Sequence, residues 1–211
     1  MIKSNALLRL TVAAIAALAL GGCISLFPKS DPAQLYRFGQ TPVSTTATAP
    51  PAGSVAVFRA GSVFQSEASG DRLLAITGDE ASYIADSRWV APASVLWDQA
   101  VLTAFDAAPG RVRLVSRGEL ARADYVLRLD VRSFETRYEN GPDAAPTVLV
   151  RVRAALTRPR DRAFAREQIF EARVPAAGNR VSAIVGGYDR ATADVLGQLA
   201  RWLEAEATPL A

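Results

Sequence analysis

The chain alternates apolar and polar residues most clearly between residues 125 and 175. In YVLRLDVRSFETRY one side of the alternation is apolar, as in a strand with one buried and one solvated face: Tyr125, Leu127, Leu129 and Val131. Beyond Ser133 the apolar phase slips by one residue, to Phe134, Thr136 and Tyr138. A slip of this kind predicts a β-bulge near Ser133.

Two more long strands follow. The segment TVLVRVRAALT alternates cleanly, and its apolar face consists of Val148, Val150, Val152, Ala154 and Leu156. EQIFEARVPA comes next, after the polar turn RPRDRA. Earlier in the chain, SVAVFRA and RVRLVS predict short strands. RLLAIT and ASYIAD predict a hairpin, since the turn residues Gly78, Asp79 and Glu80 separate them.

Two segments have helical periodicity. The first begins near Pro92, which suits a first helical turn, and it stops at Pro109 and Gly110; its apolar face is predicted to be Val95, Leu96, Leu102 and Phe105. The second runs from about Ser182 to Ala207 and is interrupted by Gly186 and Gly187, each costing about 1 kcal/mol relative to Ala. Either the helix packs closely there or it kinks, and we favour close packing. The pattern predicts a single α/β domain with a mixed, mostly antiparallel sheet and two main helices.

The start of the chain resembles an export signal. A basic beginning with Lys3 and Arg9 precedes an apolar run of 11 residues, shorter than the roughly 20 needed to cross a bilayer. This is typical of a secretory signal peptide. The residues LGGC, ending at Cys23, resemble the bacterial lipobox, in which the cysteine becomes the acylated first residue. We therefore expect a signal peptide at 1–22, a tether and linker at 23–54, and the folded domain at 55–207.

The tether has two parts. In QLYRFG, the residues Leu35, Tyr36 and Phe38 are expected to form a short strand that pins the chain to the domain. The uncharged, Thr- and Pro-rich TPVSTTATAPPA at 41–52 predicts an extended linker. From Cys23 to Leu35 the free tether then reaches at most about 40 Å. We expect residues 1–54 to add little to the core.

Composition excludes several classes of chemistry. The chain has 24 Lys and Arg against 21 Asp and Glu, and losing Lys3 and Arg9 leaves 22 basic residues and a charge of +1. That balance indicates no nucleic-acid partner. There is no His, the one Cys is predicted to be acylated, and the one remaining Lys, Lys29, lies in the tether. Serine- or cysteine-protease chemistry and ordinary zinc sites lack their residues, and no phosphate-binding loop is present. We expect no catalytic residues, no cofactor and no metal.

The remaining candidate sites have ordinary structural interpretations beside the functional ones. We interpret both acidic pairs, Asp79 with Glu80 and Glu135 with Glu139, as solvated strand ends. Positions 135 and 139 of a strand lie roughly 13 Å apart, which is farther than the about 5 to 9.5 Å between the two catalytic carboxyl groups of glycosidases. Nine Arg residues between 128 and 166 suggest a lipid-headgroup surface, a solvated sheet face or a subunit contact, and from them we take Arg151 and Arg153 as possible partner contacts.

The sequence SRWVAP contains a further short signal. Trp89 is interpreted as a core residue covering the start of the helix at Pro92, or as an interface aromatic. Arg88 would brace the same corner.

The order and spacing of the sequence elements resemble those of the ABC-type transport auxiliary lipoproteins. The elements are the lipobox Cys23, the Y-x-F strand, the Thr/Pro linker, SVAV, the hairpin, RW-x-x-P, ADYVLRLDVRSFE and VLGQLARWL. The resemblance implies an α/β domain like the N-terminal domain of the Tol-system propeller protein. It also implies a non-catalytic subunit, in some cases a ring, that works with an ABC ATPase, a permease and a mammalian-cell-entry (MCE) protein in lipid transport across the periplasm. The sequence departs from the resemblance at Gly186 and Gly187.

The acylated Cys23 would carry fatty-acid chains such as palmitate. The residue after it is Ile24 and not Asp, which by the Gram-negative sorting rule implies delivery to the outer membrane. The leading hypothesis is therefore a periplasm-facing outer-membrane lipoprotein that binds an MCE protein and forms a homo-oligomer. An outer-membrane assembly or secretion-pore lipoprotein is the alternative. The longest hairpin, 125–157, carries charges on its outward face, which disfavours membrane insertion. A carboxylate-dependent envelope hydrolase is a third possibility, but it requires a deep cleft.

Overall fold

The computed structural model describes residues 32–39, 53–107, 110–115, 117–118, 123–159 and 161–208, except the side chains of 162–164. The predicted signal peptide, Cys23 and the linker at 41–52 lie outside these residues. One compact unit spans Ala33–Ala211.

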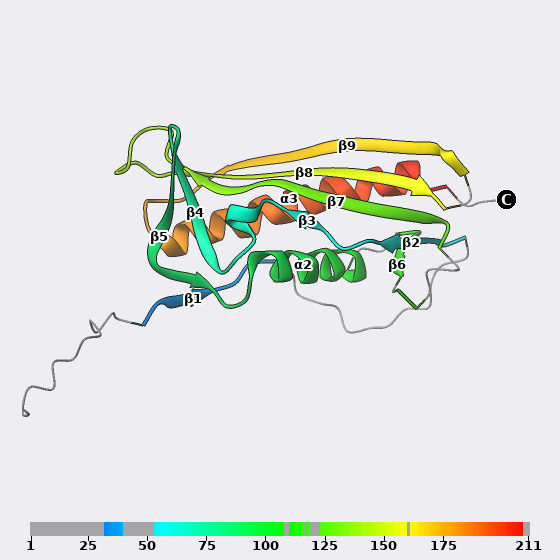
Figure 1. The fold of residues 1–211 in the computed structure, drawn as a ribbon, viewed down its shortest axis with the longest axis horizontal. Coiled ribbons are helices and arrows are strands. Elements are labelled where there is room, and N and C mark those ends of the chain that lie inside the picture. Colours follow the sequence, from blue (N-terminus) through cyan, green and yellow to red (C-terminus); the bar gives the residue numbers. More distant parts are fainter. Residues whose placement is uncertain are drawn as a thin grey trace, which may run out of the picture. The chain divides into compact units, whose positions relative to one another are not determined.

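The described strands form one sheet around a long central strand, β7 (Tyr125–Arg137), as Figure 1 shows. The other strands are β1 (Gln34–Tyr36), β2 (Val55–Arg59), β3 (Val63–Phe64), β4 (Arg72–Thr77), β5 (Glu80–Trp89), β6 (Val112–Val115), β8 (Thr147–Arg158) and β9 (Asp161–Pro175). One edge of β7 pairs with β8, which pairs with β9, and both pairings are antiparallel. Along its other edge lie β2, β3 and β4 in succession, all parallel to β7. A short 3-10 helix, η1 (Ser66–Ala68), separates β3 from β4.

The predicted α/β fold with a mixed sheet and two main helices is confirmed, and so is the hairpin, since β4 and β5 pair antiparallel. The longest pairings, β7–β8 and β8–β9, are antiparallel. Parallel pairs are nevertheless numerous, because β2 also pairs parallel with β6 and β1 with β5. Parallel neighbours require crossover connections, and α2 (Ala93–Ala107) and α3 (Val181–Glu206) supply the helical layer.

The predicted bulge in β7 is present. Pairing with β8 shifts register between Val131 and Ser133. Before the shift, positions 125 to 131 bury every second side chain; after it Phe134 and Thr136 lie in the core, and Ser133 and Glu135 are buried as well. The bulge therefore keeps apolar side chains in the core along the full length of β7.

The apolar face predicted for α2 is wrong in part. Leu96 and Phe105 are buried, but Val95 and Leu102 are each 44% exposed. Seven residues apart, these two share one side of a helix with 3.6 residues per turn. The helix turns its other side inward, where Trp97 is fully buried with Val101. Burial of that larger set removes more apolar surface from water than burial of Val95 and Leu102 would.

Helix α3 is continuous through its glycine pair and packs on β8 and β9. A Cβ atom at Gly187 would lie 2.8 Å from Cγ2 of Val148, whose side chain is fully buried in β8. At Gly186 the nearest atom is Nη1 of Arg190, 3.8 Å away. The expectation of close packing is therefore confirmed, and Gly187 is the residue that requires it.

The two glycines predict opposite effects of the same substitution. Gly186→Ala should stabilise the domain by about 0.5 to 1 kcal/mol, because Ala favours the helix and its methyl group makes only an ordinary van der Waals contact with Arg190. Gly187→Ala should destabilise it by about 1 to 3 kcal/mol, because the methyl group forces the helix away from Val148. Urea unfolding of both variants measures the difference, and equal shifts would contradict close packing at Gly187.

Candidate functional site

The RW-x-x-P residues form the corner between β5 and α2. Arg88 forms an ion pair with Asp71 at 2.8 Å, and both side chains are about half exposed. Trp89 is 2% exposed, so its ring lies in the core. The carbonyl oxygen of Pro92 accepts hydrogen bonds from the amides of Val95 and Leu96, which places Pro92 immediately before the first helical residue. This corner fixes the start of α2 and exposes little of Trp89 to a partner.

Strand β5 changes direction before this corner. Its pairing with β4 passes from Leu74 opposite Tyr83 to Arg72 opposite Arg88, so several residues of β5 form a wide bulge. Within it Asp86 has a φ of 51°, a left-handed conformation that is uncommon for a residue other than glycine. Beyond the bulge, Ser87–Trp89 pair with β1. The bend therefore makes the far end of β5 available to the N-terminal segment.

Residues 34–39, which we call the strap, tie the N-terminal segment to the domain. β1 pairs in parallel with Ser87–Trp89, and the carbonyl of Tyr36 accepts a hydrogen bond of 2.7 Å from Val90 N. Phe38 follows at 1% exposure. The predicted strand is confirmed at Leu35 and Tyr36, but it ends at Tyr36 and does not include Phe38. The expectation that residues before 55 add little to the core is wrong, because Phe38 is part of it.

The strap ends at Gly39, between the two helices. Its amide donates a 2.7 Å hydrogen bond to Oδ1 of Asp189 in α3. Its φ of +73° is readily adopted only by glycine, and a Cβ there would lie 2.4 Å from Cβ of Ala100 in α2. Gly39 thus closes the strap against both helices at a point where no other residue fits.

Five aromatic rings surround the end of the strap: Phe38, Phe64, Trp89, Phe134 and Tyr188. The Phe38 ring centroid lies 5.0 Å from that of Trp89 and 4.9 Å from that of Phe134. Tyr188 of α3 contacts the same two rings, at 5.2 and 4.7 Å. This aromatic cluster joins the strap, β5, β7 and α3, and offset or edge-on ring pairs of this kind add about 0.5 to 1.5 kcal/mol each beyond area burial.

The hydroxyl group of Tyr188 is the polar centre of the cluster. It accepts a 3.1 Å hydrogen bond from Thr136 Oγ1 and faces the carbonyl of Leu74 at 3.5 Å. Burial raises the pKa of Tyr188 far above its ordinary value, since the phenolate would lose its hydration. Tyr188 therefore stays neutral at any physiological pH, which suits a structural role.

The two arginines singled out as possible partner contacts are both paired within the sheet. Arg151 binds Glu171 of β9 at 2.6 Å, and Arg153 binds Glu167 at 2.5 Å. A hydrogen bond to Glu167, together with its charge, raises the pKa of Arg153 above its ordinary value. These cations are thus neutralised by neighbours rather than held ready for a phosphate.

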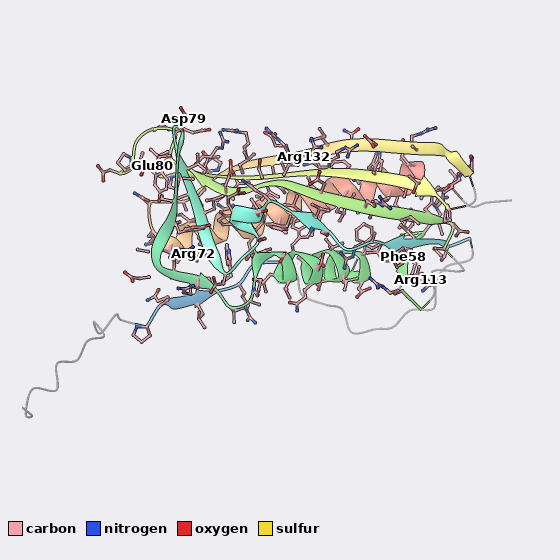
Figure 2. All side chains as sticks on the ribbon, viewed as in Figure 1. Phe58, Arg72, Asp79, Glu80, Arg113 and Arg132 are labelled. Carbon is pink, nitrogen blue, oxygen red and sulfur yellow. The ribbon has the colours of Figure 1, made fainter. Side chains whose placement is uncertain are left out.

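The same pairing extends across the solvated face. Asp130 of β7 lies opposite Arg153 of β8 and binds Arg132 at 3.1 Å. Figure 2 shows Arg132 on the side of the sheet away from α2. We call this surface, with Arg151, Arg153, Glu167 and Glu171, the ion-paired face. Its charges alternate, as on a solvated sheet or a charged subunit contact.

The acidic pairs form no catalytic dyad. Asp79 and Glu80 are exposed at the tip of the β4–β5 hairpin (Figure 2). The interpretation of Glu135 as a solvated strand end is wrong, because it is 4% exposed and forms a 2.8 Å ion pair with Arg137. It lies opposite Leu149, which is 1% exposed, so both faces of the sheet are covered at this level.

The described residues form neither a metal site nor a membrane-spanning helix. Within 32–39, 53–107 and the later described ranges, no group of three or more His, Cys, Asp or Glu residues is placed to hold a metal ion. In the same part of the chain, neither α2 nor α3 has the length and apolarity of a membrane-spanning helix.

Sequence reasoning placed Phe38 in a strand, whereas it lies beyond the end of β1 and is a core residue. It missed the contact of Gly39 with Asp189, which lies 150 residues further along the chain and leaves no local pattern. The signal that was present is Gly39 directly before the Thr- and Pro-rich linker, since glycine is the residue that most readily adopts a left-handed conformation.

Comparison with protein families identifies the class of this α/β domain. The model of the ABC-type transport auxiliary lipoprotein component matches residues 69–200, which is more than half of the chain. The chain therefore belongs to the ABC-type transport auxiliary lipoprotein family, as the order of its sequence elements indicated. The comparison with curated proteins gives no match.

Solved structures share the fold. A Xanthomonas campestris protein of the family DUF330 superposes with a TM-score of 0.67 at 22% identity, over 82% of this chain and 96% of that one. The hypothetical protein CT253 of Chlamydia trachomatis superposes with a TM-score of 0.50 at 11% identity, over 73% of this chain and 98% of that one. At these identities the likeness establishes the fold and nothing more.

The strap is expected to contribute to stability through Phe38. Phe38→Ala should cost about 3 to 5 kcal/mol, because it leaves a cavity inside the aromatic cluster. The matched control is Leu35→Ala in the same strap, which should change stability by no more than about 0.5 kcal/mol because its side chain is 63% exposed. Urea unfolding measures both, and similar losses would mean that Phe38 does not plug the core.

Tyr188 predicts a pH-dependent effect. At neutral pH, Tyr188→Phe should cost about 1 kcal/mol through the lost hydrogen bonds. Above about pH 10 the unfolded chain releases the phenol proton while the folded protein keeps it, so the wild type loses stability as pH rises. The variant lacks this loss, and the stability difference should shrink between about pH 9 and 11. A difference that stays constant in urea titrations across that range would contradict the pKa shift.

Proposed function

We propose that the protein is a non-catalytic lipoprotein subunit of an MCE-type ABC transport system that moves phospholipid or another lipid across the periplasm. Cys23 carries the lipid anchor, and the domain faces the periplasm from the outer membrane. The observation that carries this proposal is membership of the transport auxiliary lipoprotein family. The lipid cargo and the MCE partner follow from the sequence resemblance.

The geometry of the strap supports an anchored role. The residues directly after the proposed tether are a strand in the sheet, a ring in the core and a glycine fitted between two helices. An anchor at Cys23 would thus be attached to the domain at a fixed point, where the strap is packed against the sheet and the helices. Fixed tethering raises the effective concentration of the domain toward neighbours on the same membrane.

A non-catalytic role is consistent with the charged groups. The buried Glu135 is neutralised by Arg137, and the arginines of the ion-paired face are matched by Glu167 and Glu171. Acid–base catalysis by two carboxyl groups needs a pair whose pKa values are set apart from each other at one cleft. The chain instead offers sheet edges and an ion-paired face, which are suited to association with further copies and with the MCE protein.

The test is capture of the partner by the protein in its native envelope. Crosslinking in cells, followed by purification and mass spectrometry, should recover an MCE-domain protein and further copies of the chain. Mass spectrometry of the mature N-terminus should find an acylated Cys23, and Cys23→Ala should release a soluble, folded domain. Recovery of peptidoglycan enzymes alone would refute the proposal.

A charge-swapped variant tests the ion-paired face without destroying its pairing. In Arg151→Glu with Glu171→Arg the ion pair is kept in reverse, so the fold should be retained while the surface pattern is inverted. We expect weaker self-association and weaker MCE capture. The control is the same swap at Arg88 and Asp71, an ion pair of similar exposure in the β5–α2 corner. Undiminished capture by the first swap would remove this face as the docking surface.

A further inference from the structure

Exposed apolar side chains gather at one corner of the domain. Seven large hydrophobic side chains are exposed among the described residues. Three of them surround the place where the strap meets the start of α2: Leu35 at 63%, Val90 at 55% and Val95 at 44%. We call these three residues the apolar corner. Single exposed apolar residues need no explanation, but a group at one place indicates a contact.

The three residues are joined by backbone contacts. Leu35 lies in β1 opposite Arg88, and the amide of Val90 binds the carbonyl of Tyr36 in the same strand. Val95 follows in the first turn of α2, with its amide bound to the carbonyl of Pro92. Figure 1 shows β1 next to the start of α2. Nothing in the described part of the chain covers this corner.

Of the other four exposed hydrophobic residues, Leu102 lies two turns after Val95 on the same side of α2, and Val63 lies in β3. The ring of Tyr83 is covered by the guanidinium of Arg72, 3.8 Å from its centroid. Ile169 lies on β9, between the ion-paired Glu167 and Glu171. Strands β1 and β9 stand at the two ends of the path β1-β5-β4-β7-β8-β9. Five strand spacings, or about 24 Å along the sheet, separate them. Ile169 is therefore a natural control for the apolar corner.

A cation lies beside the apolar corner. Arg37, two residues after Leu35, is exposed and forms no ion pair with any described residue. This differs from the ion-paired face, where the arginines are matched by carboxylates. Apolar side chains next to an unmatched arginine suit a phospholipid surface, since leucine and valine enter the boundary between headgroups and acyl chains while arginine binds phosphate.

The short chain before the strap keeps this corner within reach of the membrane. Gln34 follows Cys23 by 11 residues, which span at most about 37 Å when fully extended. The strap is the first part of the domain after the anchor, and Leu35 is exposed within it. Weak contacts made by three side chains are therefore favoured by the high local concentration of lipid.

We propose that the apolar corner, together with Arg37, rests in the interface of the phospholipid membrane that holds the anchor. The sheet then stands with its β1 edge toward the bilayer and its β9 edge toward the periplasm. This inference rests on the proposed lipid anchor at Cys23. It adds an orientation, which anchoring alone does not supply.

The experiment uses single cysteines in the full lipoprotein. Acylation consumes the thiol of Cys23, so a cysteine introduced at Leu35, Val90 or Ile169 is the one free thiol. Each variant is labelled with an environment-sensitive fluorophore and incorporated at high dilution into phosphatidylethanolamine and phosphatidylglycerol vesicles with brominated acyl chains. We expect labels at 35 and 90 to shift to the blue and to be quenched several-fold more than the label at 169.

A second substitution tests whether the apolar side chains cause the contact. With the label at position 35, Val90→Asp should remove most of the quenching, because the carboxylate must leave water to enter the interface. Ile169→Asp, on a residue that is also half exposed, should leave the quenching unchanged. Circular dichroism checks that both variants keep the fold.

Each contrary outcome has a definite meaning. Vesicle-bound protein with acylated Cys23 but no preferential quenching at 35 and 90 overturns the orientation and leaves the anchor in place. Labels at 35 and 90 that are protected from an aqueous quencher yet not quenched by the brominated chains would show a protein occupant, such as a second copy, and would also overturn it. An unmodified Cys23 refutes the anchor and the orientation together.

Discussion

The insertion of Phe38 into the aromatic cluster is the contact on which the arrangement of this domain depends. The ring comes from a six-residue strap ahead of the linker, and it touches Trp89 and Phe134 at about 5 Å. Tyr188 of α3 contacts the same two rings. One side chain from the N-terminal segment thereby joins the corner of β5, the central strand and the long helix in a single packed unit.

The neighbouring features serve this contact. The bulge in β7 turns Phe134 toward the core, and the wide bulge in β5 carries Ser87–Trp89 to the strap. Gly187 allows α3 to approach β8 closely enough for Tyr188, the next residue, to reach the rings. Cores are packed to crystal-like density, so a shift at any of these places is transmitted to the strap.

Periodicity in the sequence was sufficient for the long strands, the hairpin, the bulge near Ser133 and the extent of α3, because each depends on neighbours in the chain. It was insufficient where tertiary contacts decide. In α2 both sides carry apolar residues, and the burial of Trp97 rather than Val95 depends on what lies opposite. The alternation in β7 places Glu135 on the other face of the sheet from Phe134, so the sequence predicted a solvated side chain. Both faces of the sheet are covered at this level, and Glu135 is buried. The contact of Gly39 with Asp189 joins positions 150 residues apart.

The parallel pairing of β1 with β5 has a mechanical consequence. A force that reaches the domain through an N-terminal tether and acts along the axis of β1 loads the hydrogen bonds of Gln34–Tyr36 in shear, so they share the load instead of opening one after another. Behind them, Phe38 has to leave the core before the chain yields further. Resistance to pulling at this end of the domain therefore comes first from the backbone hydrogen bonds of β1 and then from the buried ring of Phe38.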